Sequence, residues 1–214
     1  MSNKSSVMLV DDHPLLLKGL KQLLEFETDI EVIAEANNGP DAIRLAENLD
    51  PDLIVLDLNM HGMDGLETLK EMRKVGVTSR IVMLTVSDAD EDVVEAISSG
   101  ADGYLLKDMD PEKLLEQIRR ALDGKMVLSE AITEILATAI RKPAPRQQAD
   151  LNNLTNREYE ILSLIAKGMS NKVIARELDI SDGTVKVHVK HLLKKLGLRS
   201  RVEAAVWMVN QQSN

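Results

Sequence analysis

The first 124 residues alternate five short apolar runs with five segments of helical periodicity, and this alternation constrains the fold more than any other feature of the chain. The apolar runs lie at residues 6–10, 30–35, 52–56, 80–84 and 103–106. The helical segments lie near residues 13–26, 39–48, 64–75, 89–99 and 111–123. Strands that alternate with helices of this length form βαβ units, so we expect an α/β domain with a five-stranded parallel sheet. The runs at 52–56 and 80–84 are rich in Val, Ile and Leu, which is typical of strands covered on both faces.

The last 64 residues show helical patterns only. Thr155 and Glu158 form a Thr-x-x-Glu capping signature, and Gly197 is placed to end a later helix. We expect four short helices that form a separate all-α domain. Apolar residues at helical spacing predict a linker helix over 129–142, and “PAPRQQAD” at 143–150 predicts extended chain. The predicted division is therefore a domain at 1–124, a linker at 125–150 and a domain at 151–214.

The net charge changes sign along the chain. Residues 1–124 carry 12 basic and 26 acidic side chains, whereas residues 151–214 carry 10 basic and 6 acidic side chains. This asymmetry indicates two domains with different partners. The chain has no cysteine, which excludes disulfides and thiolate metal sites. It also lacks a run of about 18 apolar residues, so we expect a cytoplasmic protein without a membrane partner.

Polar side chains follow four of the five predicted strands. Asp11 and Asp12 follow the first, Asp57 the third, Thr85 the fourth and Lys107 the fifth. Because the carboxyl ends of parallel strands meet at one edge of a sheet, we expect these groups to converge there. Each could be an ordinary loop residue, but four strand ends at once would require coincidence. Neighbouring carboxylates repel one another unless a cation intervenes, and Mg²⁺ prefers oxygen ligands of this kind.

The motifs “VDDHP”, “LDLNMHGMDG”, “LTVSD” and “GADGYLLKD” occur in this order at the predicted strand ends. They resemble the receiver domain of two-component response regulators over about residues 6–123. The resemblance implies a flavodoxin-like (CheY-like) fold, Mg²⁺ as the cofactor and a sensor histidine kinase as the partner. The site residues that it implies are the phosphoacceptor Asp57, the metal ligands Asp11, Asp12, Asp57 and Asn59, the phosphoryl contacts Thr85 and Lys107, and the switch residues Thr85 and Tyr104.

His61 is the one visible departure from this family pattern, which commonly has Pro at that position. A histidine here could relay a phosphoryl group or bind a metal ion. We prefer the interpretation of an exposed turn residue, since no second histidine lies at a ligand-like spacing from it. The departure concerns the rigidity of the loop and leaves the chemistry unchanged.

Residues 183–202 contain six basic side chains and no acidic one. On a helix, Lys186, Val187, Lys190 and Lys194 share one face, and the apolar residues occupy another. Such a helix fits the major groove, where lysines reach phosphates or guanine edges and Val187 can touch a thymine methyl group. A solvated lysine-rich face is the simpler alternative, but the helix–turn–helix spacing of “SNKVIARELDISDGTVKVHV” favours DNA binding.

The stretch from “LTNREYEILSLIAKGMSNKVIARELDIS” through “TVKVHVKHLLKKL” resembles the LuxR/FixJ-type helix-turn-helix over about residues 151–212. The resemblance implies transcription regulation on double-stranded DNA, bound as a homodimer. The segments “TVSDADEDVVEAI”, “TVKVHVKHLLKKL” and “SRVEAAVW” further resemble the nitrate- and nitrite-responsive members of this family.

Together these features predict a DNA-binding transcriptional response regulator activated by phosphorylation of Asp57. It would not be an enzyme beyond self-phosphorylation from phosphodonors and self-dephosphorylation. The acidic domain is expected to shield the recognition helix until it is phosphorylated. One alternative is a regulator with an inert receiver that binds DNA independently of phosphorylation. Another is an aspartate-nucleophile phosphatase, which Asn59 disfavours because such enzymes need an acid at that position.

Overall fold

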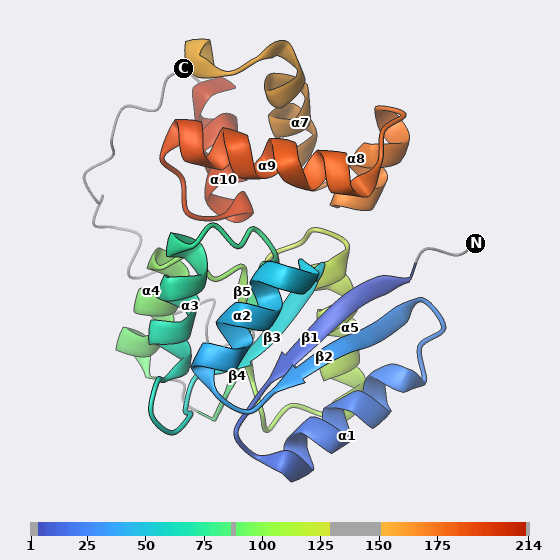
Figure 1. The fold of residues 1–214 in the computed structure, drawn as a ribbon, viewed down its shortest axis with the longest axis vertical. Helices are drawn as coiled ribbons and strands as arrows, with labels where there is room; N and C mark the ends of the chain where they lie inside the picture. Colours follow the sequence, from blue (N-terminus) through green and yellow to red (C-terminus); the bar gives the residue numbers. More distant parts are fainter. Residues whose placement is uncertain (1–3, 87–88, 129–150, 213–214) are drawn as a thin grey trace.

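The computed structural model describes residues 4–86, 89–128 and 151–212. Within these ranges the chain forms an α/β domain and a helical domain that lies against one edge of its sheet (Figure 1). The predicted linker helix at 129–142 and the extended segment at 143–150 fall outside the described residues. No helix in the described ranges is both long and apolar enough to span a membrane.

A parallel sheet forms the centre of the α/β domain, with strand order β2-β1-β3-β4-β5-β6. Its strands are β1 (Ser5–Val10), β2 (Ile30–Ala36), β3 (Leu53–Asp57), β4 (Arg80–Thr85), β5 (Gly103–Leu106) and β6 (Val127–Leu128). Every residue of β3 and β4 is buried. Their aliphatic composition accounts for this burial, because both faces of a central parallel strand are covered by helices.

Among the described residues the sheet has six strands, so the prediction of five strands was wrong. The additional edge strand, β6, is two residues long and lies in the segment that the sequence assigned to the linker. Gly103 makes room for it, because a Cβ on this residue would lie 2.4 Å from Cγ2 of Val127. A two-residue strand is too short to show a period of two, so the sequence pattern did not reveal it.

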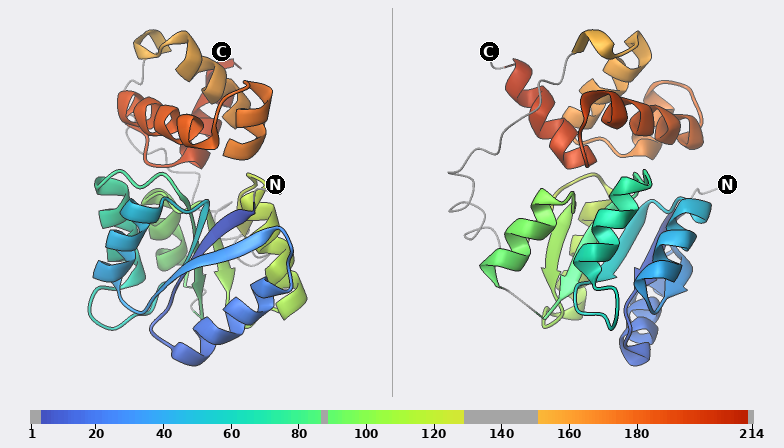
Figure 2. Two further views of the ribbon diagram at one scale, coloured as in Figure 1. Left: turned by 45° about the vertical axis from the view of Figure 1, so that its right-hand side comes forward. Right: turned by 60° about the vertical axis from the view of Figure 1, so that its left-hand side comes forward.

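Helices cover both faces of the sheet (Figure 2). They are α1 (Pro14–Glu25), α2 (Gly39–Leu49), α3 (Gly65–Lys74), α4 (Asp90–Ser98) and α5 (Pro111–Leu122). The apolar faces of α1 and α5 pack on one side, and those of α2, α3 and α4 pack on the other. The two resulting clusters hold the strands rigidly, so groups at the strand ends are placed accurately.

The helical domain contains η1 (Leu151–Asn153), α7 (Asn156–Ala166), α8 (Asn171–Glu177), α9 (Asp182–Leu196) and α10 (Arg201–Gln212). The predicted capping box at the start of α7 is present, with both the Thr155 and the Glu158 hydrogen bonds formed. The predicted apolar face of α9, including Val185, Val189 and Leu192, is buried in a hydrophobic cluster of this domain's own. The domain therefore has a core that is independent of the sheet.

The helical domain meets the α/β domain at the edge where the strands begin (Figures 1 and 2). Lys172 on α8 donates a hydrogen bond of 2.6 Å to the carbonyl oxygen of Lys4, just before β1. Gly124, which follows α5, approaches Gly168 so closely that a Cβ would lie 2.2 Å from the Gly168 carbonyl oxygen. Asp57 ends its strand and so lies at the opposite edge of the sheet.

Candidate functional site

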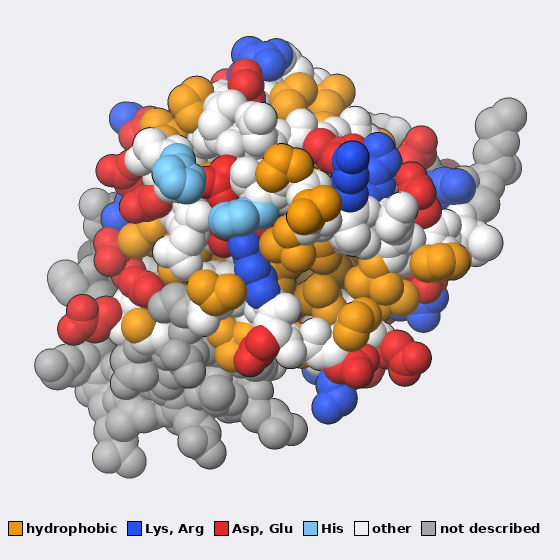
Figure 3. All heavy atoms as spheres, turned by 90° about the horizontal axis from the view of Figure 1, so that it is seen from below, with side chains coloured by type: hydrophobic (Ala, Val, Ile, Leu, Met, Phe, Trp, Pro, Cys, Tyr) orange, Lys and Arg blue, Asp and Glu red, His pale blue; other side chains and the backbone are white. Residues whose placement is uncertain are grey.

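Three carboxylates meet at the edge of the sheet where the strands end. Asp57 is the last residue of β3 and is 1% exposed, and Asp11 follows β1 and is 2% exposed. Ligand atoms of Asp11, Asp12, His13 and Asp57 all lie within 4.8 Å of one another. Figure 3 views the molecule from this end, where histidine side chains lie beside acidic ones. The structure thus brings together the three acids that the sequence predicted to converge.

Lys107 bridges two of these acids. Its Nζ lies 2.7 Å from Oδ2 of Asp11 and 2.9 Å from Oδ2 of Asp57. Its backbone N–H donates to the carbonyl oxygen of Thr85 at 2.7 Å, which ties the loop after β5 to the end of β4. The ammonium group is therefore held where it can contact an anion on Asp57.

Burial raises the pKa of the Asp57 carboxyl group above its usual range, and the charge of Asp11 adds to this effect. The hydrogen bond from Lys107 and the Asn59 backbone N–H oppose the shift without cancelling it. The site therefore has more negative charge than Lys107 balances, and a further cation would relieve it.

Asn59 and Thr85 lie together beside Asp57. The Asn59 side chain donates from Nδ2 to Oγ1 of Thr85 at 3.2 Å, and its backbone N–H donates to Oδ1 of Asp57 at 3.2 Å. Tyr104 is fully buried and pairs with Met83 of β4. The structure thus links Thr85 to Asp57 through Asn59, while the role of Tyr104 as a switch stays a prediction.

His61 contacts the site in a way that the sequence did not suggest. Its backbone N–H donates to Oδ2 of Asp12 at 2.9 Å, and its Nδ1 lies 2.5 Å from the same oxygen. Nδ1 of His13 lies 2.9 Å from Oδ1 of Asp12, so an imidazole faces each carboxylate oxygen. Burial raises the pKa of Asp12, but these contacts outweigh it and the pKa falls below the usual range. The His61 side chain is 97% exposed, as a turn residue would be, yet it has a partner 49 positions away.

The donor set of this site fits a hard divalent cation. Oδ1 of Asp12 and Oδ2 of Asp57 are buried, and each oxygen keeps acceptor capacity beyond its contact with one nitrogen. Each lies beside a cationic or ionisable nitrogen, on His13 and Lys107 respectively. Converging carboxylate oxygens with unused acceptor capacity are ligands that Mg²⁺ prefers.

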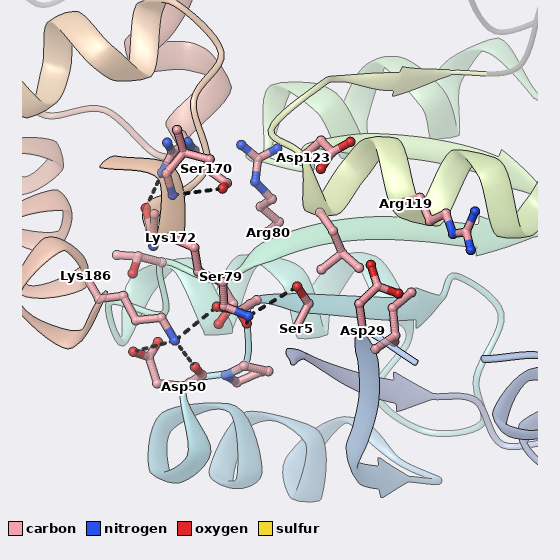
Figure 4. A pocket seen from close by; sticks show the side chains of 18 of the residues that line it. Ser5, Asp29, Asp50, Ser79, Arg80, Arg119, Asp123, Ser170, Lys172 and Lys186 are labelled. Carbon is pink, nitrogen blue, oxygen red and sulfur yellow. Dashed lines mark hydrogen bonds and ion pairs between the residues drawn. The ribbon is translucent and has the colours of Figure 1, made fainter. Parts of the chain in front are cut away.

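The predicted recognition helix, α9, faces the α/β domain. Lys186 Nζ donates to the carbonyl oxygen of Asp50 at 2.5 Å (Figure 4). It also lies 3.5 Å from Oδ1 of Asp52. Lys172 on α8 lies 3.2 Å from Oδ2 of Asp52. Burial raises the pKa of Asp52, but the Ser6 backbone N–H and the two lysines hold it below the usual range. We refer to the contacts of Asp50 and Asp52 with Lys172 and Lys186 as the interdomain latch.

The other residues predicted to contact DNA lie along the same helix. Val187 is 53% exposed, and Lys194 is exposed near the end of α9. Lys190 lies against Gly76, since a Cβ on that glycine would be 3.2 Å from the lysine Nζ. The structure therefore keeps the predicted set on one helix and directs two of its lysines at the α/β domain.

A buried acid at the end of a parallel strand, joined to a helix-turn-helix, defines a signalling regulator with a DNA-binding output. Residues 7–119 match the response regulator receiver domain, and residues 152–208 match the luxR family of bacterial regulatory proteins. The chain belongs to the response regulators of this LuxR type, a family of DNA-binding transcription regulators and not of enzymes.

Similar proteins cover nearly the whole chain. The nitrate/nitrite response regulator protein NarL of Escherichia coli K12 is 57% identical, over 97% of each chain. NarP of the same strain is 51% identical, over 96% of this chain and 95% of NarP. The crystal structure of the response regulator ChrA from a heme-sensing two-component system has 32% identity and a TM-score of 0.52, and it covers 98% of both chains.

Proposed function

We propose that Asp57 accepts a phosphoryl group from the phosphohistidine of a partner sensor histidine kinase. The observation that carries this proposal is the buried Asp57 carboxylate at a strand end, with the Lys107 ammonium 2.9 Å away. A carboxylate oxygen attacks the phosphorus atom, and the N–P bond breaks with its electron pair on the imidazole nitrogen. Lys107 offsets negative charge on the phosphoryl oxygens, and Thr85 supplies a hydroxyl hydrogen bond to them.

The same site would hold Mg²⁺ through Asp11, Asp12, Asp57 and the backbone carbonyl of Asn59. When bound, Mg²⁺ supplies positive charge that neutralises the carboxylates and the incoming phosphoryl oxygens. Small phosphodonors can then label Asp57 without a kinase, and water can remove the label. Asn59 offers an amide that donates to Thr85 at 3.2 Å and no acid to protonate a leaving group, which argues against a phosphatase acting on small phosphoesters.

The proposal is tested by labelling with acetyl phosphate and Mg²⁺. We expect the wild type to be labelled and Asp57→Asn to remain unlabelled. Asp64→Asn is a matched control, because Asp64 is the N-cap of α3 and Asn caps a helix equally well. Labelling of Asp57→Asn would refute the site assignment. Unchanged gene regulation by this variant would instead favour the inert-receiver alternative.

We propose that phosphorylation frees α9 to bind double-stranded DNA through Lys186, Val187, Lys190 and Lys194. Supporting this proposal, Lys186 binds Asp50 and is 15% exposed, so it is occupied while the domains are closed. Shifts in the side-chain positions of Thr85 and Tyr104 would transmit the conformational change away from the phosphorylated Asp57. A homodimer on DNA would match a two-fold site, and binding should weaken steeply with salt. Binding by the unphosphorylated full chain that is as tight as binding by residues 147–214 would refute the shielding.

We propose that the protein acts in the cytoplasm in nitrate- and nitrite-responsive gene control, with domains at 1–124 and 151–214 joined by 125–150. The support is the 57% and 51% identity to regulators named for nitrate and nitrite. Because the kinase senses the signal, the test is a reporter strain that carries the cognate kinase, with and without nitrate. Nitrate should change reporter output, and Asp57→Asn should abolish the change.

A further inference from the structure

We propose that a second groove between the domains binds a phosphate-bearing anion of nucleotide size, which holds the domains closed. The groove has a volume of about 680 Å³ and lies between the end of α3 with the turn after it and the second half of α9. It is separate from the interdomain latch and from the carboxylates around Asp57. The inference goes beyond phosphorylation and rests only on the closed arrangement of the two domains.

The charge of this groove is of one sign. Its lining includes six cationic residues and no acidic one: Lys70, Arg73, Lys74, Lys190, Lys194 and Arg199. Both walls contribute, since the first three belong to the α/β domain and the last three to the helical domain. Such a concentration of positive charge attracts anions, most strongly those with several charges.

Three of these cations already have acidic partners. Lys70 pairs with Glu95 at 2.7 Å, Lys74 with Glu71 at 3.0 Å, and Arg73 is buried against Asp102 at 2.8 Å. By contrast, the side chains of Lys190, Lys194 and Arg199 form no ion pair with an acid among the residues that the structure describes. The Arg199 guanidinium donates to the carbonyl oxygen of Ser98 at 2.8 Å, and the Arg199 backbone N–H donates to Oε2 of Glu203 at 2.7 Å. Closing the domains therefore places three positive charges of the helical domain, none with an ion-pair partner in the described ranges, opposite the cationic wall of the α/β domain, and an anion between the walls would relieve their repulsion.

The size and the apolar part of the lining narrow the class of ligand. Val75, Val77, Leu193 and Leu198 lie among the cations. Sites of about 300–1,000 Å³ with apolar walls and a few polar groups suit molecules of nucleotide size. A nucleoside polyphosphate offers several phosphate charges for the lysines and a base for the apolar side chains.

Binding would stabilise the closed state by linkage. The two walls face each other only while the domains are closed, so the anion binds this state more tightly than the open one. Lys190 and Lys194 are also predicted to contact DNA, so the anion and DNA would compete for the same helix. The ligand would thus act as a negative effector of DNA binding.

The test is isothermal titration calorimetry of the full unphosphorylated chain with ATP, without metal ions and at constant ionic strength. Lys74→Gln removes a cation from the α/β wall, and Lys194→Gln removes one from the α9 wall. We expect each to weaken binding roughly five-fold or more, because each loses a charge-assisted contact. Lys113→Gln, an exposed lysine on α5 far from the groove, should bind as the wild type does.

Weakening by Lys194→Gln alone would show that the anion binds only α9, and it would overturn the proposal. So would equal weakening by the Lys113→Gln control, or no ATP binding at all. Sodium tripolyphosphate forms a second arm, because it tests the charges without the base. Tighter binding of ATP supports the contribution of the apolar residues, whereas equal binding overturns the nucleotide class. Asp57→Asn, which lacks the proposed phosphoacceptor, should bind ATP as the wild type does. ATP binding therefore tests the groove independently of the phosphorylation proposal.

Discussion

Replacing Asp52 with Asn should release the recognition helix without phosphorylation. Asp52 Oδ2 lies 3.2 Å from Lys172 Nζ, and Oδ1 lies 3.5 Å from Lys186 Nζ. The substitution removes the negative charge that both lysines face. Asn can still accept hydrogen bonds like those that Asp52 now accepts from the Ser6 backbone N–H and hydroxyl, at 2.9 and 3.0 Å. The start of β3 should therefore stay attached to β1.

The expected size of the effect follows from the exposure of these pairs. The three side chains are 15–17% exposed, so each ion pair should contribute near the upper end of the range for surface pairs, about 0.5–1 kcal/mol. Losing both would weaken the closed state by about 1–2 kcal/mol, which is roughly a 5- to 30-fold change in the equilibrium. Since apparent DNA affinity scales with the fraction of open protein, the unphosphorylated variant should bind DNA tighter by a similar factor.

The assay is fluorescence anisotropy with a labelled target duplex at one fixed salt concentration. Glu35→Gln is the matched control, because it also removes one negative charge and one ion pair, with Lys21 at 2.6 Å, away from the latch. Its DNA affinity should stay within about two-fold of the wild type. Equal affinities of Asp52→Asn and the wild type would refute the latch. An equal gain in the control would show that general charge, and not the latch, sets the affinity.

Three further predictions concern the α/β domain. Because the folded-state pKa of Asp57 is raised, the stability that this group contributes is present at low pH and is lost as the pH rises through that value. Asp57→Asn should therefore raise the Tm of the metal-free protein at neutral pH by a few degrees, which corresponds to about 1 kcal/mol of added stability. The Tm is measured by calorimetry with a chelator present, and a lower Tm for the variant would contradict the prediction. His61→Pro removes both donors from Oδ2 of Asp12, one of the carboxylates proposed to bind Mg²⁺. Titration calorimetry should therefore show roughly two- to five-fold tighter Mg²⁺ binding, whereas weaker binding would mean that the histidine assists the metal. Asp102→Ala leaves the buried charge of Arg73 unpaired, so it should lower the free energy of unfolding in urea by about 3–5 kcal/mol. Glu95→Ala breaks an exposed ion pair with Lys70 and should lower it by less than about 1 kcal/mol.

The central strands and the acids that follow them could be predicted from the sequence because a short-range pattern determines both. The apolar run predicted at 52–56 is the observed β3, Leu53–Asp57, shifted by one residue. Parallel strands share one carboxyl edge, so the meeting of Asp11 and Asp57 follows from the pattern itself. By contrast, β6 depends on Gly103 leaving space beside β5, and nothing in the two residues of β6 indicates that space.

Contacts between distant segments could not be predicted in the same way. His61 and Asp12 are 49 positions apart, and their contact depends on how two loops lie at one edge of the sheet. The charge asymmetry predicted that the acidic domain would face the basic helix. It did not single out Asp50 and Asp52, because the first 124 residues hold 26 acidic side chains that serve equally well by charge alone.

In the proposed mechanism, the weakness of the latch would allow a single phosphoryl group to open it. Asp57, the proposed phosphoacceptor, ends β3, and Asp52 lies just before the same strand begins, so the two sites lie at opposite ends of one buried strand. Phosphorylation can shift the equilibrium only by the difference in its interaction energy between the closed and open states, typically about 1–3 kcal/mol between coupled sites. A large apolar interface between the domains would exceed that range and stay closed. A few partly exposed ion pairs between Asp50, Asp52 and the lysines of α8 and α9 fall within it.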